Sequence, residues 1–460
     1  MSNSPTVPAP PPDLFYHYIL PHSGRPAVLL ERDPDGWRLP LFRPQTRFLG
    51  RVGQVTAAAR RQLGVEAVTL LCVDLMDHRP ALHQVDATYS MEIRDPAWQP
   101  GPSHAWFGRA ELAEVGLAVA GEQRIVSSYL RELESGLTPP LRKPWATRGW
   151  YSRASAWIDE ECARLGRERT GPVEQVKQLA FTAVLKAPTR AGDLYFKAVP
   201  PIFGAEPSVT AALARLFPGV VPSPLATMRG TDESWMLTED FGGEVLFSIT
   251  EEQSGAILDL LASMQIDFVG RESDLLALGC ADRRLGKLAA EIAPLLSDPS
   301  STQGLEAGEV ERLRALVPTL ESMCARLASY NIPETLVHGD FYGGNTVVAG
   351  GHYMIFDWTD VALSHPFLDL VTGLHLDDPQ LPPEAVARLK SRYLAAWAEY
   401  GAPERLEEAL QLALPLSAVY QSISYRAIFA QWEEGDYSRW ELRRAIPGFL
   451  RLVLSELGQR

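Results

Sequence analysis

Several features are missing from this chain of 460 residues, and each absence excludes a class of protein. The sequence has no stretch of about 18 uninterrupted apolar residues, which argues against a helix that spans a membrane. It has no Lys- and Arg-rich run that would follow a nucleic-acid backbone, and its net charge of −14 repels polyanions. We therefore expect neither a membrane nor a nucleic acid among its partners.

Cysteine is also scarce. The four cysteines lie far apart, without a C-x-x-C pair or an accompanying histidine spacing, so they predict neither disulfides nor zinc ligands: Cys72, Cys162, Cys280 and Cys324. Residues 1–13 are rich in Ser and Pro and lack the basic start and apolar segment of a signal peptide. We expect a disordered tail and a cytoplasmic protein.

What the chain does contain is typical of a globular protein, with 46% hydrophobic and 22% charged residues, and its length predicts two or three domains. From residue 14 onward, short apolar runs between Gly, Pro and Asp indicate strands joined by turns. A helix is expected from about Gln54 to Leu63, ending at Gly64, followed by the strand-like VEAVTLLCVD and ATYSMEI. Prolines near residue 140 mark a linker, so the first domain is predicted at 14–140.

The remainder predicts a small sheet followed by a helical part. A helix is expected from Trp150 to Gly166, and strands follow in AFTAVLKAP and DLYFKAV. Beyond Glu251 nearly all apolar spacing is helical, apart from an island at 336–358. We predict an α+β fold with a sheet region at 141–245 and a mainly helical region at 246–460.

The island carries the strongest chemical signal in the chain. It reads L-V-H-G-D-F-Y-G-G-N-T-V-V at 336–348 and Y-M-I-F-D-W at 353–358, which predicts a hairpin turning at Gly350 and Gly351. Phosphoryl transfer needs a carboxylate at the acceptor hydroxyl and metal ions on the phosphate, and Mg²⁺ prefers hard oxygen ligands. Asp340, Asn345 and Asp357 supply these groups. H-G-D alone is equally typical of a turn, but the full order of residues argues against that reading.

At this point the chain resembles the aminoglycoside phosphotransferase and choline kinase family, distant relatives of protein kinases, over about residues 150–450. The resemblance implies a two-lobed, protein-kinase-like fold and an ATP-dependent, Mg²⁺-dependent kinase. It implies that Asp340 is the catalytic base and that Asn345 and Asp357 bind magnesium. It also implies that His338 and Asp369 brace the loop.

If Asp340 is a kinase base, a strand lysine should reach the nucleotide phosphates and a helix acid should hold that lysine. Lys197 in L-Y-F-K-A-V and Glu206, just ahead of a helix-like run, fit these roles. The hinge that reads the adenine edge is then predicted at Glu239, Asp240 and Phe241. No G-x-G-x-x-G precedes Lys197, so the phosphates need other cover and GTP remains an alternative to ATP.

The order of elements in residues 14–140 resembles a Nudix fold, but the catalytic acids of that family are missing. Arg61 and Gln62 stand where its metal-binding glutamates should be, and Ala57 and Ala58 replace its Arg-Glu pair. We therefore expect a degenerate module without hydrolase activity. Its open roles are a cap, a ligand sensor, an oligomerisation surface that forms a homodimer, or a structural extension.

The predicted function is a kinase for a hydroxyl of a small polar acceptor, such as an aminoglycoside, an amino sugar or a choline-like alcohol. The acceptor is a cation if acids of the helical region line its pocket; the candidates are Asp377, Asp378, Glu433, Glu434 and Asp436. Aromatic residues of the last helices could line an apolar or quaternary-ammonium site or pack the core: Trp397, Tyr420, Tyr425, Phe429, Trp432, Tyr437 and Trp440. The alternative is a non-catalytic regulator that binds a nucleotide or metabolite, and intact Asp340, Asn345 and Asp357 argue against it.

Overall fold

A computed structural model describes residues 13–46, 48–77, 84–246, 249–374, 381–433, 436–438 and 442–458. The chain forms two compact units: one runs to Ala191 and includes the segment that begins at Trp432, and the other holds residues 192–431 and the C-terminal segment from Leu442. We describe each unit separately. The domain boundaries at 140 and 245 stay predictions, and the predicted tail lies outside the described residues except for Asp13.

The first unit begins with two sheets. One has the order β4-β1-β6-β5, in which β1 and β6 are parallel and the other pairs antiparallel, and the second has the order β3-β2-β7. Their strands are β1 Asp13–Ile19, β2 Val28–Asp33, β3 Gly36–Arg38, β4 Leu41–Phe42, β5 Ala67–Asp77, β6 Gln84–Ile93 and β7 His104–Phe107. The predicted helix is confirmed as α1 Gly53–Leu63, which packs on β5 and ends at Gly64 in the left-handed conformation. Two more helices follow, α3 Arg109–Val115 and α4 Ala120–Ser135.

The rest of this unit is a helix, a hairpin and a returning segment. The helix is α5 Trp150–Arg164, which confirms the predicted helix, and the hairpin strands are β8 Glu174–Leu179 and β9 Thr182–Thr189. From far along the chain, the Trp432 ring stacks on Phe181 and the Tyr437 hydroxyl donates to the carbonyl of Gln178. Tyr437 and Leu179 belong to the same apolar core as the β-sheet residue Tyr89. The returning segment is therefore part of the core of the first unit.

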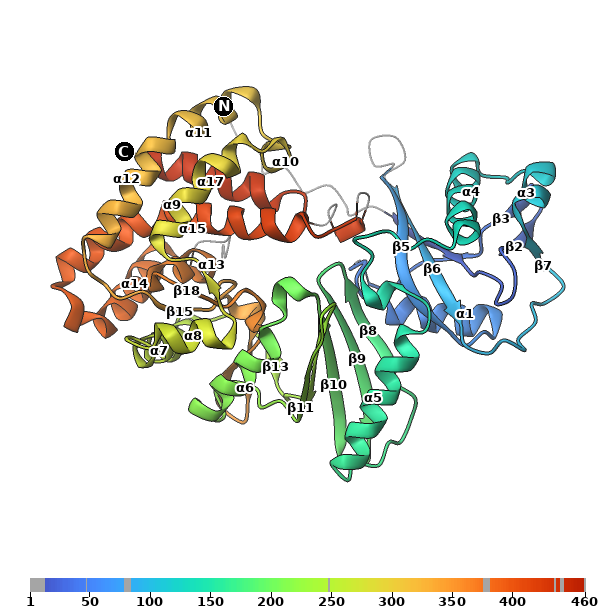
Figure 1. Ribbon diagram of the computed structural model, residues 1–460, viewed down its shortest axis with the longest axis horizontal. Coiled ribbons are helices and arrows are strands. Elements are labelled where there is room, and N and C mark those ends of the chain that lie inside the picture. The colour runs from blue at the N-terminus through green and yellow to red at the C-terminus, as the bar shows by residue number, and fades with distance from the viewer. Residues whose placement is uncertain are drawn as a thin grey trace. The chain divides into compact units, whose positions relative to one another are not determined.

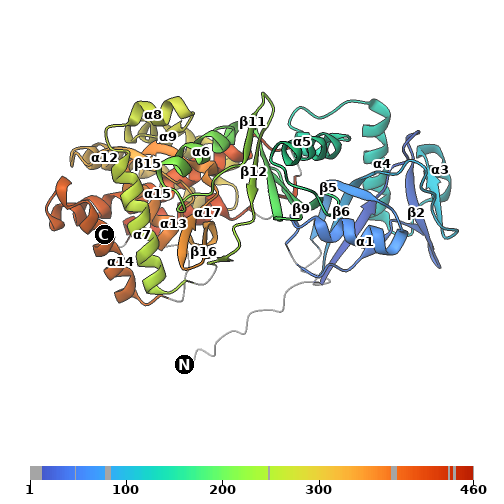
Figure 2. The same cartoon turned by 90° about the horizontal axis from the view of Figure 1, so that it is seen from below.

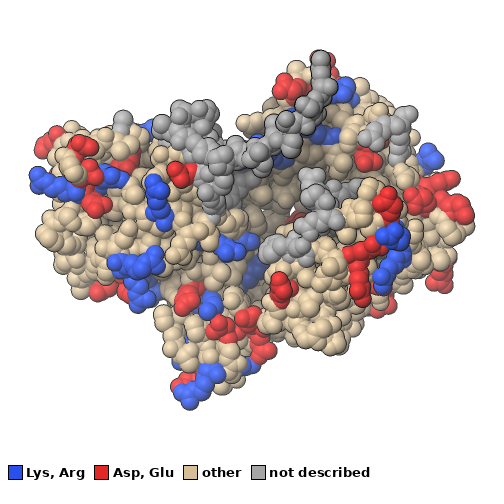
Figure 3. Space-filling model, turned by 180° about the vertical axis from the view of Figure 1, so that it is seen from behind, with Lys and Arg blue, Asp and Glu red and all other residues tan. Residues whose placement is uncertain are grey.

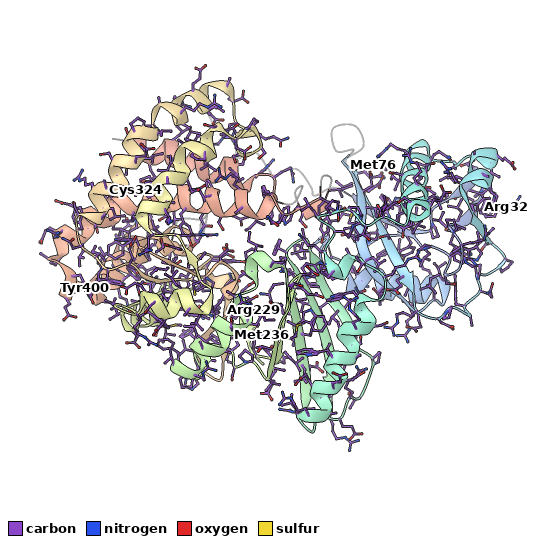
Figure 4. All side chains as sticks on the ribbon, viewed as in Figure 1. Arg32, Met76, Arg229, Met236, Cys324 and Tyr400 are labelled. Carbon is purple, nitrogen blue, oxygen red and sulfur yellow. The ribbon has the colours of Figure 1, made fainter. Side chains whose placement is uncertain are left out.

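The second unit starts with strands in the order β11-β12-β10, all antiparallel. They are β10 Gly192–Val199, β11 Ala226–Arg229 and β12 Ser234–Glu239, and α6 Glu206–Leu216 stands between β10 and β11 in the sequence. The alternating burial of β10 places Phe196 and Ala198 in the core and leaves Lys197 on the other face, opposite Met236 of β12. Figure 4 labels Met236 on β12 and Arg229 on β11.

The mainly helical region of the second unit has one large apolar core. Helix α15 packs against α17, α12 and α9, and α7 packs against α14 (Figures 1 and 2). The helices are α7 Glu251–Asp267, α8 Glu272–Leu278, α9 Leu285–Ser297, α10 Pro299–Thr302, α11 Ala307–Ala315, α12 Val317–Ala328, α13 Leu370–Leu374, α14 Pro383–Ala396, α15 Pro403–Phe429 and α17 Ala445–Gly458. The mixed α+β fold is thus as predicted.

The island also has the predicted hairpin, made of β16 Thr346–Ala349 and β17 His352–Ile355 with Gly350 and Gly351 at positive φ between them. β13 Glu244–Val245 extends this hairpin to three strands. Outside the island, two short strands break the predicted run of helices: β14 Ala281–Asp282 pairs with β18 Ala362–Ser364, which pairs with β15 Thr335–Val337 at the start of the island. These strands are two or three residues long, too short to show a period in the sequence.

Candidate active site

The polar loop after β15 is held by a buried carboxylate. Asp369, which is fully buried, accepts hydrogen bonds from the backbone N–H groups of His338 (2.9 Å) and Gly339 (2.8 Å). The side-chain amide of Gln265 on α7 donates to the same carboxylate at 3.0 Å. Burial raises the pKa of Asp369 to about 7, against the lowering effect of these three donors. The structure therefore gives Asp369 the contacts expected of a residue that braces the loop.

His338 links the loop that contains Asp340 to the segment that contains Asp357. Its Nδ1 accepts the backbone N–H of Asp340 (3.3 Å), so Nε2 carries the proton and donates to the carbonyl of Phe356 (3.1 Å). Burial lowers the pKa of His338 to about 4, and the ring is therefore neutral at neutral pH. One uncharged side chain thus fixes the backbone at Asp340 against the residue that precedes Asp357.

Asp340 and Asn345 face each other across the loop. The Asn345 amide nitrogen donates to the Asp340 backbone carbonyl at 2.8 Å and to the Asp340 carboxylate at 3.1 Å. Both bonds use the nitrogen, which leaves the amide oxygen of Asn345 as its acceptor atom. Burial, then the negative charges of Asp360 and Asp357, raise the pKa of Asp340 to about 7, against the lowering effect of the Asn345 hydrogen bond.

Lys197, Glu206 and Asp357 form a second cluster. The Lys197 ammonium donates to Glu206 at 2.6 Å and to Asp357 at 2.7 Å. Burial acts to lower the pKa of Lys197, but the two carboxylates outweigh it and the pKa is raised, so the lysine is charged. Glu206 is 1% exposed at the first turn of α6, and its Oε2 has no hydrogen-bond partner among the described residues.

Asp357 has an unusual backbone. Its φ of 64° and ψ of 59° lie in the left-handed region, which few residues other than glycine adopt. Thr359 donates its hydroxyl to the Asp357 carboxylate at 3.1 Å. A non-glycine residue held in this conformation is typical of a functional site, where surrounding contacts offset the local strain.

The three predicted hinge residues lie at the end of β12. Glu239 and Asp240 are exposed, and the Asp240 carboxylate accepts the backbone N–H of Gly242 (3.0 Å), which is the role of a turn former. The Phe241 ring lies 5.4 Å from the ring of Phe356, next to Asp357. The structure thus brings Phe241 beside the site and leaves the two carboxylates at the surface.

Several residues that support the site were missed by the sequence analysis. Asp360 accepts the Ser424 hydroxyl at 2.6 Å and lies 3.9 Å from the Arg283 guanidinium. Gln421 on α15 donates to the carbonyl of Gly339. For Asp360, the one signal in the sequence was the presence of an acid three residues after Asp357. Gln265, Ser424 and Gln421 come from distant helices, and no local spacing reports on them.

A magnesium ion would find hard oxygen donors here. The amide oxygen of Asn345 and the carboxylate of Asp357 suit Mg²⁺, which is commonly bound by one or two protein groups together with phosphate oxygens and water. Within the described residues, no group of three His, Cys, Asp or Glu side chains is arranged to hold a metal ion. The oxygen atoms of Asn345 and Asp357 therefore fit a magnesium ion whose other ligands are phosphate oxygens and water.

The acids and aromatic residues considered for the acceptor have varied positions. Glu433 is paired with Arg142 at 2.6 Å in the first unit, and Asp436 accepts the backbone N–H of Ser438. The described aromatic residues are buried or half-buried: Trp397, Tyr420, Tyr425, Phe429, Trp432 and Tyr437. The remaining candidates, Asp377, Asp378, Glu434 and Trp440, lie outside the described residues.

Through the part of the chain that the structure describes, no helix is long and apolar enough to cross a membrane.

Residues 181–408 match the model of the phosphotransferase enzyme family (APH), and this segment belongs to that family. No curated protein matches the chain by sequence. Among solved structures, a macrolide 2′-phosphotransferase type I is 16% identical, with 66% of this chain and 97% of that one covered and a TM-score of 0.45.

Two further solved structures have lower TM-scores. A spectinomycin phosphotransferase in complex with ADP and spectinomycin is 9% identical, with 65% of this chain and 97% of that one covered and a TM-score of 0.44. A NUDIX hydrolase from Nitrosomonas europaea is 19% identical, with 27% and 73% covered and a TM-score of 0.24. TM-scores this low do not establish a shared fold. The Nudix-like fold of residues 14–140 therefore stays a prediction.

Proposed function

We propose that the phosphotransferase-family segment of this chain transfers the γ-phosphate of ATP to a hydroxyl group of a small polar acceptor, with Mg²⁺ as the metal. The observation that carries the proposal is the meeting of two clusters in one unit. A loop carboxylate, Asp340, is oriented by Asn345. A charged lysine, Lys197, is held between Glu206 and Asp357.

In this mechanism Asp340 accepts the proton of the acceptor hydroxyl as that oxygen bonds to the γ-phosphorus, while the bond from that phosphorus to the bridging oxygen breaks and ADP leaves. A pKa raised to about 7 makes its carboxylate a stronger base than an ordinary aspartate while still ionised in part at neutral pH. The Asn345 amide holds one oxygen of this carboxylate, and His338 and Asp369 hold the backbone beneath it. These contacts limit the motion of the base, which favours a productive orientation.

Lys197 is the group proposed to hold the nucleotide phosphates, with Glu206 fixing its position. Asn345 and Asp357 would hold Mg²⁺, which supplies neutralisation of the charge on the transferring phosphoryl group. Phe241 is proposed to lie at the edge of the adenine site, and backbone groups of the 239–241 segment to read the base. The acceptor candidates are aminoglycosides, amino sugars and choline-like alcohols, and GTP is the alternative phosphate donor.

A nucleotide-consumption screen tests the proposal. Wild-type protein and the Asp340→Asn variant are incubated with Mg²⁺, ATP or GTP, and the acceptor panel, and phosphorylated product is identified by mass spectrometry. We expect product with wild type and at least one acceptor, and a large loss in the variant. Equal product formation by both proteins would show that this loop is not the catalytic site. Nucleotide binding without turnover on any acceptor would favour the regulator alternative.

A further inference from the structure

The first unit contains a large cavity that the proposed phosphotransfer does not use. Its volume is about 820 Å³, and it is lined by α1, the start of β5, α5 and the segment that leads into β8. Helix α1 contributes one face, from Gly53 through Thr56 and Ala57 to its last turn. All of its lining residues belong to the first unit, so the cavity exists independently of the Lys197 and Asp340 clusters.

Four arginines line this cavity: Arg60, Arg61, Arg94 and Arg169. Two of them are already neutralised, because Arg60 pairs with Glu66 at 2.7 Å and Arg169 pairs with Asp159 at 2.6 Å. The third acid in the lining, Glu174, lies 3.9 Å from Lys186. Arg61 and Arg94 have no carboxylate partner among the residues described in the first unit. The lining therefore holds four arginines against three carboxylates, a net charge of +1 in a chain whose net charge is −14.

The position of Arg94 is fixed by an aromatic platform. Its guanidinium lies 4.6 Å from the centre of the Tyr151 ring, and its backbone N–H donates to the carbonyl of Glu66 at 2.7 Å. Tyr151 is buried, and its hydroxyl donates to the carbonyl of Val173. A guanidinium stacked on a buried ring loses little further side-chain freedom when it binds a ligand.

The polar groups around Gln175 in the cavity lining are neutral and hydrogen-bonded to one another. The Gln175 side chain accepts the backbone N–H of Thr69 at 2.7 Å and donates to the carbonyl of Thr69 at 2.8 Å. Thr56 donates its hydroxyl to the same side chain at 3.1 Å. Because these groups already bind one another, the unpaired charges of Arg61 and Arg94 dominate what the cavity attracts.

We propose that this cavity is a binding site for a phosphate-bearing small molecule, whose phosphate is contacted by Arg61 and Arg94. Guanidinium groups donate paired hydrogen bonds that match phosphate oxygens. The cavity lies within the range of roughly 300–1,000 Å³ that is typical of ligand sites, so it holds an organic part as well as the phosphate. A nucleic acid is disfavoured by the net charge of −14 and by the mixture of both signs of charge on the face drawn in Figure 3.

Calorimetry on the full-length chain tests this site, with inorganic pyrophosphate as the probe and without magnesium or acceptor. Arg61 lies exposed near the end of α1, so Arg61→Gln should fold normally. We expect Arg61→Gln to weaken pyrophosphate binding by about tenfold, and Arg61→Gln combined with Arg94→Gln to weaken it further. Arg131→Ala is the matched control, because Arg131 is an exposed arginine of α4 outside the cavity lining.

Wild-type affinity in Arg131→Ala, together with the loss in the cavity variants, supports the site. The same affinity in all four proteins, an equal loss in the control, or no binding to wild type at millimolar pyrophosphate would overturn it. The assay involves no turnover, so its result is separate from the proposed phosphotransfer. Loss of catalysis in Asp340→Asn would leave pyrophosphate binding at the cavity unchanged.

Discussion

The Lys197 ammonium lies 2.7 Å from the Asp357 carboxylate, although 160 residues separate them in the sequence. The same ammonium lies 2.6 Å from Glu206, so one cation serves two carboxylates. The contact joins β10 of the small sheet to Asp357, two residues beyond the end of β17. The stability of this region and the geometry of the proposed nucleotide site therefore depend on the same three side chains.

Replacing Asp357 should weaken nucleotide binding specifically when magnesium is present. Asp357→Ala removes a carboxylate proposed to contact the metal, so we expect the gain in nucleotide affinity on adding Mg²⁺ to be largely lost. Calorimetric titrations with and without Mg²⁺ measure this gain. Glu311→Ala, at an exposed position of α11, is the control and should keep it. An unchanged magnesium-dependent gain in Asp357→Ala would remove this residue from the metal site.

Removing Lys197 should destabilise the fold as well as the site. Lys197→Ala leaves the buried Glu206 carboxylate without its cation, and breaking a buried pair costs on the order of 3 kcal/mol in free energy of unfolding. Adding Glu206→Gln removes the uncompensated charge and should restore part of that stability. Urea denaturation of the single and double variants measures both effects. A double variant less stable than Lys197→Ala would contradict this account of the pair.

Gly339 should tolerate substitution far less than Gly350. Both have positive φ, but a Cβ at Gly339 would collide with the backbone oxygen of Asp360, whereas a Cβ at Gly350 would meet open space. We expect Gly350→Ala to cost about 1 kcal/mol in stability from backbone conformation alone. Gly339→Ala should cost roughly 2 kcal/mol more and should displace the loop. Thermal unfolding compares them, and equal losses would argue against the close approach.

The sequence predicted those parts of the site that are local. The hairpin of β16 and β17 follows from apolar runs on either side of Gly350 and Gly351, and the loop residues follow from one short motif. Lys197 and Glu206 could be predicted from the sequence, because a kinase-like site requires a lysine and an acid upstream of the catalytic loop. Their direct contact with Asp357 was not, since it depends on the packing of distant segments.

The remaining support for the loop has no local signature. Gln265 and Gln421 bond to it from α7 and α15, and each is a buried polar residue among mainly apolar buried residues of its helix. The return of Tyr437 to the core of the first unit was missed for the same reason. Its aromatic neighbours indicated burial, but burial alone does not say in which core a side chain lies.

The pH dependence of stability should carry a signature of His338. Burial lowers its pKa to about 4 from an ordinary 6.5, so below pH 6.5 the unfolded chain takes up a proton that the folded chain refuses. The contribution is present above pH 6.5 and is lost as the pH falls toward 4. Between about pH 7 and 5 it amounts to roughly 2 kcal/mol. Urea denaturation of wild type and His338→Asn at both pH values should show a smaller fall in the variant. Equal falls would contradict a buried neutral histidine.

The central claim is that Asp340 is the base for phosphoryl transfer, and the most direct test is the turnover of Asp340→Asn on an acceptor that wild type phosphorylates. The substitution keeps the size of the side chain and removes its ability to take a proton. We expect product formation to fall by about 100-fold or more, while magnesium-dependent nucleotide affinity and unfolding midpoint stay close to those of wild type. Retention of most of the wild-type turnover, in a variant that binds nucleotide normally, would contradict the account.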